Sequence, residues 1–160
     1  MHVKTIVKED FVNYKKPSML IGAVSCNWKC CSDAGKSFEL CQNSIWYSSP
    51  TEYINDEMLC KDYLGNPLTS AIVFGGLEPL DQFDEIVEFI ELLREVFKCE
   101  DDVVIYTGYN KDEISDQIDS LRKYKNIIVK FGRYVPNQPA HYDEVLGVYL
   151  ASDNQYAEQL

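Results

Sequence analysis

The chain has 160 residues, six of them cysteine, and a formal net charge of −11 at pH 7. This length predicts a single domain, residues 1–160, that buries a core without needing disulfides. The negative charge argues against a nucleic-acid partner, because phosphate binding depends on lysine and arginine. No apolar run approaches the roughly 20 residues of a membrane span, so we expect no membrane association.

The amino terminus and the cysteines together predict a cellular location. Residues 1–6 lack the charged start, apolar stretch and cleavage site of a secretion signal, so we expect a cytoplasmic protein. Thiols stay reduced in the cytoplasm, where six cysteines are metal ligands or bystanders more often than three disulfides. Cys60 and Cys99 lie far from the other four in sequence, and we expect both to be buried in the core.

The first half of the chain contains two short apolar runs that predict buried strands. The first run covers residues 19–25, and a cysteine-rich loop follows it. A mixed polar segment over 50–64 predicts one short helix before a turn. The second run covers residues 70–74 and is closed by Gly75 and Gly76.

The second half of the chain alternates helix and strand signals. Apolar residues spaced three and four apart predict an amphipathic helix over 82–97. A strand is expected next, over 103–107, followed by a helix that is capped by Asn110 and Glu113 and ends near Lys123. The remaining elements are expected to be a strand over 127–130, a loop over 132–141 and a strand over 145–150. This alternation predicts an α/β fold with a mostly parallel sheet.

Four cysteines, Cys26, Cys30, Cys31 and Cys41, fall in the loop after the first strand. Several thiolates in one short loop suit an iron–sulfur cluster, because soft sulfur binds iron strongly. Ligands of parallel α/β sheets bind beyond the carboxyl ends of the strands. The cysteine loop and the segments 75–78, 107–109 and Lys130 all follow or end predicted parallel strands, so we expect them to line one edge of the sheet.

The ordered motifs resemble the radical S-adenosylmethionine enzymes, and among them the small activating enzymes of anaerobic ribonucleoside-triphosphate reductases. The resemblance covers nearly the whole chain and implies a partial (β/α) barrel of the radical-SAM type. The motifs that carry it are Phe11-Val-Asn-Tyr, Cys26-x3-Cys30 with Cys41-Gln-Asn43, Gly75-Gly-Leu-Glu-Pro-Leu80, Tyr106-Thr-Gly-Tyr109, Ile128-Val-Lys-Phe-Gly132 and Ala151-Ser-Asp-Asn-Gln155.

The resemblance implies cofactors and roles for particular residues. A [4Fe–4S] cluster would be held by three cysteines, with one iron left open for S-adenosylmethionine. Gly75 and Gly76 would bring backbone carbonyls to the methionine amine, with Glu78 beside it, while Lys130 would meet the carboxylate and Asn43 the adenosine. The metal ligands implied are Cys26, Cys30 and Cys41.

The resemblance also implies an activity and partners. The enzyme would cleave S-adenosylmethionine reductively to a 5′-deoxyadenosyl radical and install a glycyl radical on the large subunit of the anaerobic ribonucleotide reductase. Electrons would come from a flavodoxin or a ferredoxin. At this size little chain remains to enclose a bulky substrate, which fits a protein substrate that completes the pocket.

Two positions depart from the family pattern. The usual third cysteine falls at Asp33, and residues 31–40 look like an insertion before Cys41. We prefer Cys41 to Cys31 as the third ligand, because neighbouring side chains diverge in an extended backbone and Cys41 keeps the Gln-Asn match. Leu77 also separates the glycine pair from Glu78, which puts the role of Glu78 at the amine in doubt.

Three other interpretations stay open at the level of sequence. The first is an activase-like enzyme that also cleaves S-adenosylmethionine but modifies another protein or peptide. The second is a non-catalytic interaction module, in which Cys26, Cys30 and Cys41 hold zinc with Cys31, His2 or His141 as the fourth ligand. Lys130 is alternatively a solvated strand end.

Overall fold

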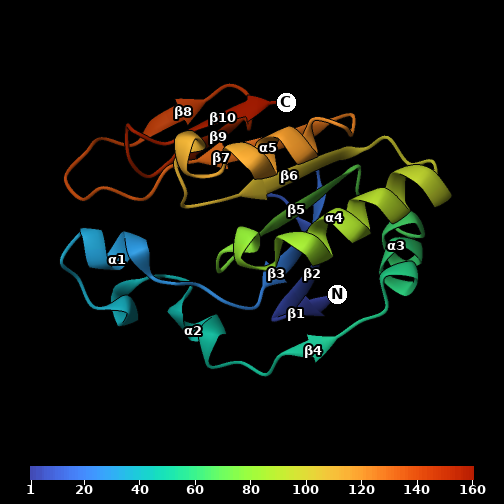
Figure 1. Cartoon of the computed structure of the whole chain (residues 1–160), viewed down its shortest axis with the longest axis horizontal. Coiled ribbons are helices and arrows are strands. Elements are labelled where there is room, and N and C mark those ends of the chain that lie inside the picture. Colours follow the sequence, from blue (N-terminus) through green and yellow to red (C-terminus); the bar gives the residue numbers. More distant parts are fainter.

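A six-stranded sheet lies at the centre of the computed structural model, which describes all residues from 1 to 160 (Figure 1). In order across the sheet, its strands are β10 (Tyr156–Gln159), β7 (Ile127–Phe131), β6 (Asp102–Tyr106), β5 (Ala71–Gly76), β3 (Ser18–Ala23) and β2 (Thr5–Asp10). The four central strands are parallel, and each edge strand is antiparallel to its neighbour. The carboxyl ends of the four central strands therefore meet at one edge of the sheet.

Helices cover one face of this sheet. They are α3 (Asp56–Leu64), α4 (Phe83–Glu91), which continues as a π-helical turn over Leu92–Val96, and α5 (Ser115–Leu121) (Figure 1). Their apolar side chains, such as Leu59 and Phe89, pack with Ile105 and Phe131 of the sheet in the larger hydrophobic core. Because side chains alternate along a strand, this face takes every second residue of the central strands.

A smaller core lies on the opposite face, where alternate residues such as Val73, Val104 and Ile128 point. Tyr14 and Leu146 complete this core. It adjoins a hairpin of β8 (His141–Asp143) and β9 (Val148–Leu150), whose Leu150 also packs there. Both faces of the central strands are thus covered, as their continuous apolar sequence requires.

The predicted elements of the central sheet are confirmed. The strands over 19–25, 70–74, 103–107 and 127–130 and the helix over 82–97 all lie where the apolar pattern places them. The short helix expected within 50–64 is α3, capped by the Asn55 side chain, which accepts from the Met58 amide. The capping box of Asn110 and Glu113 is also present, although it opens a 3₁₀ turn (Lys111–Glu113) that precedes α5.

Other predictions need correction. The sheet is open, with β2 and β10 as free edges, so it does not close into a barrel. The strand expected over 145–150 is confined to Val148–Leu150, and the loop expected over 132–141 ends in another strand, β8, which begins at His141. The antiparallel edges β2 and β10 were not predicted, because they are short or polar and lack a continuous apolar signal.

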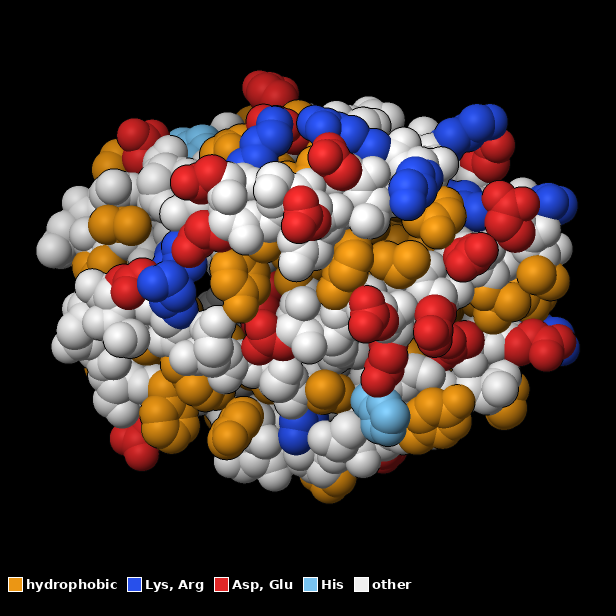
Figure 2. Space-filling model, viewed as in Figure 1, with side chains coloured by type: hydrophobic (Ala, Val, Ile, Leu, Met, Phe, Trp, Pro, Cys, Tyr) orange, Lys and Arg blue, Asp and Glu red, His pale blue; other side chains and the backbone are white.

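The remaining elements surround the cysteines or the amino terminus. They are α1 (Lys29–Asp33), a 3₁₀ turn over Phe38–Leu40, α2 (Ser44–Tyr47), a 3₁₀ turn over Pro79–Gln82 and the small ladder of β1 (His2–Val3) with β4 (Glu52–Tyr53). Acidic side chains are spread over the face shown in Figure 2, with lysine and arginine interspersed. No helix is long and apolar enough to cross a bilayer.

Candidate metal centre

The cysteine loop leaves the carboxyl end of β3 and lies to one side of the sheet, with α1 and α2 on it (Figure 1). Cys26 precedes α1, which carries Cys30 and Cys31, and Cys41 follows a 3₁₀ turn. The four sulfurs therefore come from one segment, at the edge where the parallel strands end.

All six cysteines are free thiols. The four in the loop are partly exposed, whereas Cys60 and Cys99 are buried in the core as predicted. The Sγ atoms of Cys30 and Cys31 lie 3.9 Å apart. Burial and the neighbouring Cys30 and Cys41 thiols raise the pKa of Cys31 to about 11, so the Cys31 sulfur lies beside both.

This arrangement corrects the reason for preferring Cys41 over Cys31. Residues 30 and 31 are helical rather than extended, and neighbouring side chains on a helix are about 100° apart instead of opposite. Their sulfurs therefore do not diverge. The structure places Cys31 beside both Cys30 and Cys41, and the third ligand stays a prediction.

The chemistry of the loop fits an iron–sulfur cluster, because reduced, partly accessible thiols are the ligands that such clusters use. No three Cys, His, Asp or Glu side chains stand close enough together to hold a metal ion as the loop lies here. Cys26 and Cys30 share a cavity of about 30 Å³. The residues Cys26, Cys30 and either Cys31 or Cys41 are those that would hold the cluster.

Glu78 lines the same cavity and is almost fully buried. Its carboxylate accepts hydrogen bonds from the Thr107 hydroxyl at 2.7 Å, the Gly108 amide at 2.8 Å and the Leu80 amide at 3.1 Å. Burial raises the pKa of Glu78, and these three donors oppose that effect. A carboxylate has about four acceptor positions, so one is left for a ligand.

The glycine pair is also engaged within the protein. The Gly76 carbonyl accepts a hydrogen bond of 2.6 Å from the Asn43 side chain. Gly76 has φ +80°, and a Cβ there would lie 2.9 Å from the Trp46 ring, which also stacks where a Cβ on Gly22 would be. Gly22 and Gly76 therefore make room for Trp46, and Asn43 and Trp46 attach the loop to β3 and β5.

Lys130 is buried rather than solvated, which excludes the reading of a solvated strand end. Its ammonium donates to the Gly132 carbonyl at 2.8 Å. Burial lowers the pKa of Lys130 to about 8, while Glu78 and Cys30 nearby favour its charged form. A cation is thus held behind the cysteine loop at a cost in stability.

Replacing Lys130 by methionine is expected to stabilise the metal-free protein at pH 7. The pKa falls from 10.5 to about 8, so removing the buried charge raises the unfolding free energy by up to about 3 kcal/mol. The Gly132 carbonyl keeps a donor, the Gln155 side chain at 3.2 Å.

The pH dependence has a definite sign. Between pH 8 and 10.5 the folded wild type releases the Lys130 proton while the unfolded chain keeps it, so wild-type stability rises through this window. The advantage of Lys130→Met should therefore shrink from pH 7 to pH 10. Urea unfolding of both proteins at each pH measures this difference, and a variant less stable than wild type at pH 7 would contradict it.

The sequence placed Tyr109 at this edge of the sheet, but it revealed neither the contacts of Tyr109 nor the role of Arg133 in positioning the loop. The Tyr109 hydroxyl accepts from the Asn27 side chain at 2.8 Å and donates to Asp81 at 3.1 Å. Arg133 contacts both the end of α1 and Glu113. The positions of Tyr109 and Arg133, just after the ends of β6 and β7, were the available signal, but their partners lie far away in sequence.

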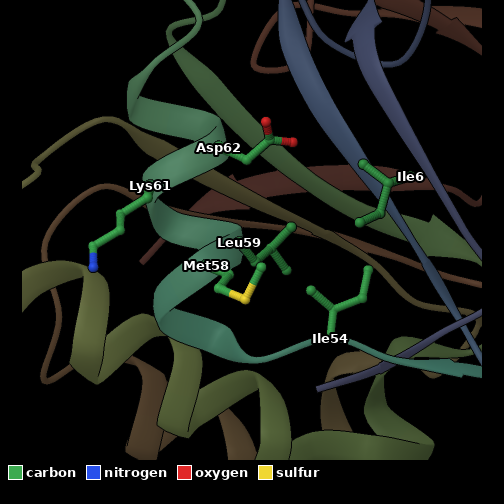
Figure 3. Close-up of a pocket in the computed structure, with 6 residues that line it drawn as sticks. All are labelled: Ile6, Ile54, Met58, Leu59, Lys61 and Asp62. Carbon is green, nitrogen blue, oxygen red and sulfur yellow. The ribbon is translucent and has the colours of Figure 1, made fainter.

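A larger pocket of about 460 Å³ lies beside α3, at the other end of the molecule from α1 (Figures 1 and 3). It is mostly apolar and is lined by Ile6, Ile54, Met58, Leu59, Lys61 and Asp62. It contains no thiol, and Lys61 is paired with Glu57. The chemistry therefore belongs to the cysteine loop and not to this pocket.

Comparison with known protein families agrees with this placement. A family model described as a 4Fe-4S single cluster domain matches residues 21–155, which begin in β3 and include every cysteine of the loop. The chain belongs to this family. Its members are iron–sulfur proteins by that description, and the matched range includes all four loop cysteines. Searches of curated proteins and of solved structures find no significant match.

Proposed function

We propose that this chain is a radical S-adenosylmethionine activase that installs a glycyl radical on the large subunit of an anaerobic ribonucleotide reductase. The observation that carries the proposal is the gathering of distinct groups at one edge of the sheet. Cys26 and Cys30 line one cavity there with Glu78, and the charges of Glu78 and Cys30 favour the charged form of the buried Lys130. Thiols for a cluster and paired charges for an amino acid are what such an enzyme needs.

The chemistry divides between the cofactors and the chain. When bound, a [4Fe–4S] cluster with one open iron and S-adenosylmethionine supply a one-electron cleavage to methionine and a 5′-deoxyadenosyl radical, which takes a hydrogen atom from a glycine of the partner. The chain's residues bind and orient. The remaining acceptor position of Glu78 would take the ammonium of the ligand, and Lys130 would offer a positive charge to its carboxylate.

Two roles implied by the resemblance need a change of geometry here. The Gly76 carbonyl is occupied by Asn43, so it meets a methionine amine only after Asn43 has moved, and Asn43 itself then becomes free to approach the adenosine. Gly75 is buried within β5, and a Cβ there would already touch the Leu20 side chain at 3.4 Å, so its approach to a ligand also needs neighbouring groups to move. Asn43 and Trp46 would thus exchange contacts with the sheet for contacts with the ligand.

A protein substrate suits the site because the loop cysteines are partly exposed and lie beside the sheet rather than in a deep cleft. A macromolecule placed over the loop would cover the cluster and exclude water. We propose the large reductase subunit in this role, with a flavodoxin or ferredoxin as electron donor. An activase-like enzyme for another protein or peptide is the nearest variant, and co-purification with a large glycyl-radical subunit separates the two.

The second candidate is a non-catalytic metal-binding module. It is favoured by the neighbourhood of Cys31 to both Cys30 and Cys41, because four thiols would satisfy a metal completely and leave no open position. The radical enzyme requires one iron of the cluster to be free.

One assay distinguishes these functions. Protein prepared without oxygen should be brown, with about four irons per chain, and dithionite with S-adenosylmethionine should release 5′-deoxyadenosine. Adding the large reductase subunit should then produce a glycyl-radical signal in electron paramagnetic resonance. A colourless, zinc-loaded protein, or an iron-loaded one that leaves S-adenosylmethionine intact, would reject the activase.

A further inference from the structure

We propose that Arg133 is a positioning residue for the cluster: through its pair with Asp33 it holds α1, which carries Cys30 and Cys31, against the carboxyl ends of β6 and β7. This inference concerns how the iron–sulfur site is built. It does not depend on whether the bound cluster cleaves S-adenosylmethionine.

Arg133 lies between the loop and the sheet. Its guanidinium contacts Asp33 at 3.5 Å and Glu113 at 2.7 Å, and lies 5.9 Å from the centre of the Tyr109 ring. Its side chain is only 10% exposed, and it lines the cavity that Cys26 and Cys30 share. A planar guanidinium binds two carboxylates in defined directions, so Arg133 connects α1 to the 3₁₀ turn before α5.

Glu113, the partner of Arg133 beside the sheet, is itself held in place by hydrogen bonds. Glu113 belongs to a capping box, in which its carboxylate accepts from the Asn110 amide at 2.8 Å. The hydrogen bond from Arg133 is the main reason why the pKa of Glu113 falls to about 2. Glu113 is therefore charged and oriented at any physiological pH, and Arg133 is held before it meets α1.

A second attachment lies on the other side of Cys30. The Asn27 side chain donates to the Tyr109 hydroxyl, which itself donates to Asp81. Residues 27 and 33 therefore both connect to the sheet edge, and the segment between them contains Cys30 and Cys31. Two attachments on either side of a ligand limit its movement more than one attachment does.

The next part of the loop, residues 34–42, makes no hydrogen bond or ion pair to the sheet, although Phe38 packs against Trp28 and Tyr47. Gly35 has no atom within 4 Å of the place where a Cβ would be, and Leu40 is 71% exposed. The loop is attached to the sheet again at Asn43 and Trp46. Rearrangement of the sulfurs around a cluster is thus expected between residues 34 and 42, against a fixed Cys26–Asp33 half.

The test compares the rate at which anaerobically reconstituted protein loses iron to a chelator. Arg133→Gln and Asp33→Asn are each expected to release iron about tenfold faster than wild type, the low end of the roughly 10–100-fold loss seen when residues behind metal ligands are changed. Arg133→Lys keeps the positive charge but loses the planar guanidinium that reaches two carboxylates, so it should release iron at an intermediate rate. Arg122→Gln is the matched control, because it breaks an exposed arginine–aspartate pair, with Asp119, far from the loop.

A second readout uses the metal-free protein, in which alkylation of Cys30, followed by peptide mass spectrometry, should be faster in Arg133→Gln and Asp33→Asn. The double variant should be hardly faster than Arg133→Gln alone, since the contact between Arg133 and Asp33 is already lost in that variant and Asp33→Asn then removes only the long pair of Asp33 with Lys29. Asp33 is half exposed, so Asp33→Asn should fold and can decide the matter if Arg133→Gln does not.

Wild-type iron release in Asp33→Asn, or equal acceleration by Arg122→Gln, would overturn the proposal. The activase is judged separately. If iron-loaded wild type fails to cleave S-adenosylmethionine, the proposed function fails and the role of Arg133 is unaffected.

Discussion

Alanine at Cys26 or Cys30 is expected to abolish iron retention, from about four irons per chain in the wild type to nearly none. These two thiols line one cavity at the fixed half of the loop. Removing either leaves two or three sulfurs, of which that of Cys41 lies outside the attached Cys26–Asp33 segment. Iron and sulfide analysis after anaerobic reconstitution measures the effect, together with the visible absorption of the cluster.

Cys60→Ala is the matched control, because Cys60 is fully buried in the core and distant from the loop in sequence. It should keep its iron and lose only about 1 kcal/mol of stability. We expect Cys41→Ala to lose iron and Cys31→Ala to keep it; the reverse result would identify Cys31 as the third ligand. Wild-type iron in Cys26→Ala or Cys30→Ala would show that the cluster is held elsewhere.

Glu78→Ala is expected to lower the unfolding free energy by about 3 kcal/mol or more. It leaves the Leu80 amide, the Thr107 hydroxyl and the Gly108 amide without their shared acceptor in a buried position. Each unsatisfied buried donor costs roughly 1–3 kcal/mol, reduced where water enters the space left by the side chain. Urea unfolding of the metal-free protein at pH 7 measures the loss.

Glu78→Gln tests the geometry more finely. One carboxylate oxygen accepts from Leu80 and Thr107 and the other from Gly108, so the amide oxygen replaces one of them and the NH₂ group meets a donor. We expect a loss of about 1–2 kcal/mol, smaller than for alanine. Glu57→Ala is the control, since Glu57 pairs only with Lys61 on the surface and its loss should leave the free energy of unfolding close to that of the wild type. An unchanged Glu78→Ala would show that the three contacts do not stabilise the fold.

The elements that could be predicted from the sequence are those whose side chains are buried. The four parallel strands and α4 were predicted because their side chains are apolar in a pattern that only one secondary structure can bury. The edge strand β2 was missed because residues 8–10, Lys-Glu-Asp, are charged, and an edge strand needs no apolar face on its outer side. The β8–β9 hairpin was missed in part for the same reason, since Tyr142 and Tyr149 are exposed.

The candidate site divides in the same way. The sequence alone determined which thiols share a loop and which strand ends lie beside it, because both follow from order along the chain and from the rule that parallel strands share one carboxyl edge. It also predicted an iron–sulfur cofactor, which membership in the 4Fe-4S single cluster family supports, while the choice of the loop cysteines as its ligands stays a prediction.

Only the tertiary structure decided how those groups are used. It placed Trp46 on Gly22 and Gly76, joined Glu78 to three donors from two segments, and paired Arg133 with both Asp33 and Glu113. These partners are separated by up to 100 residues, and polar contacts leave no periodic trace in a sequence. Distance and direction between side chains arise only when the sheet brings its strand ends together, and for that reason they had to be observed.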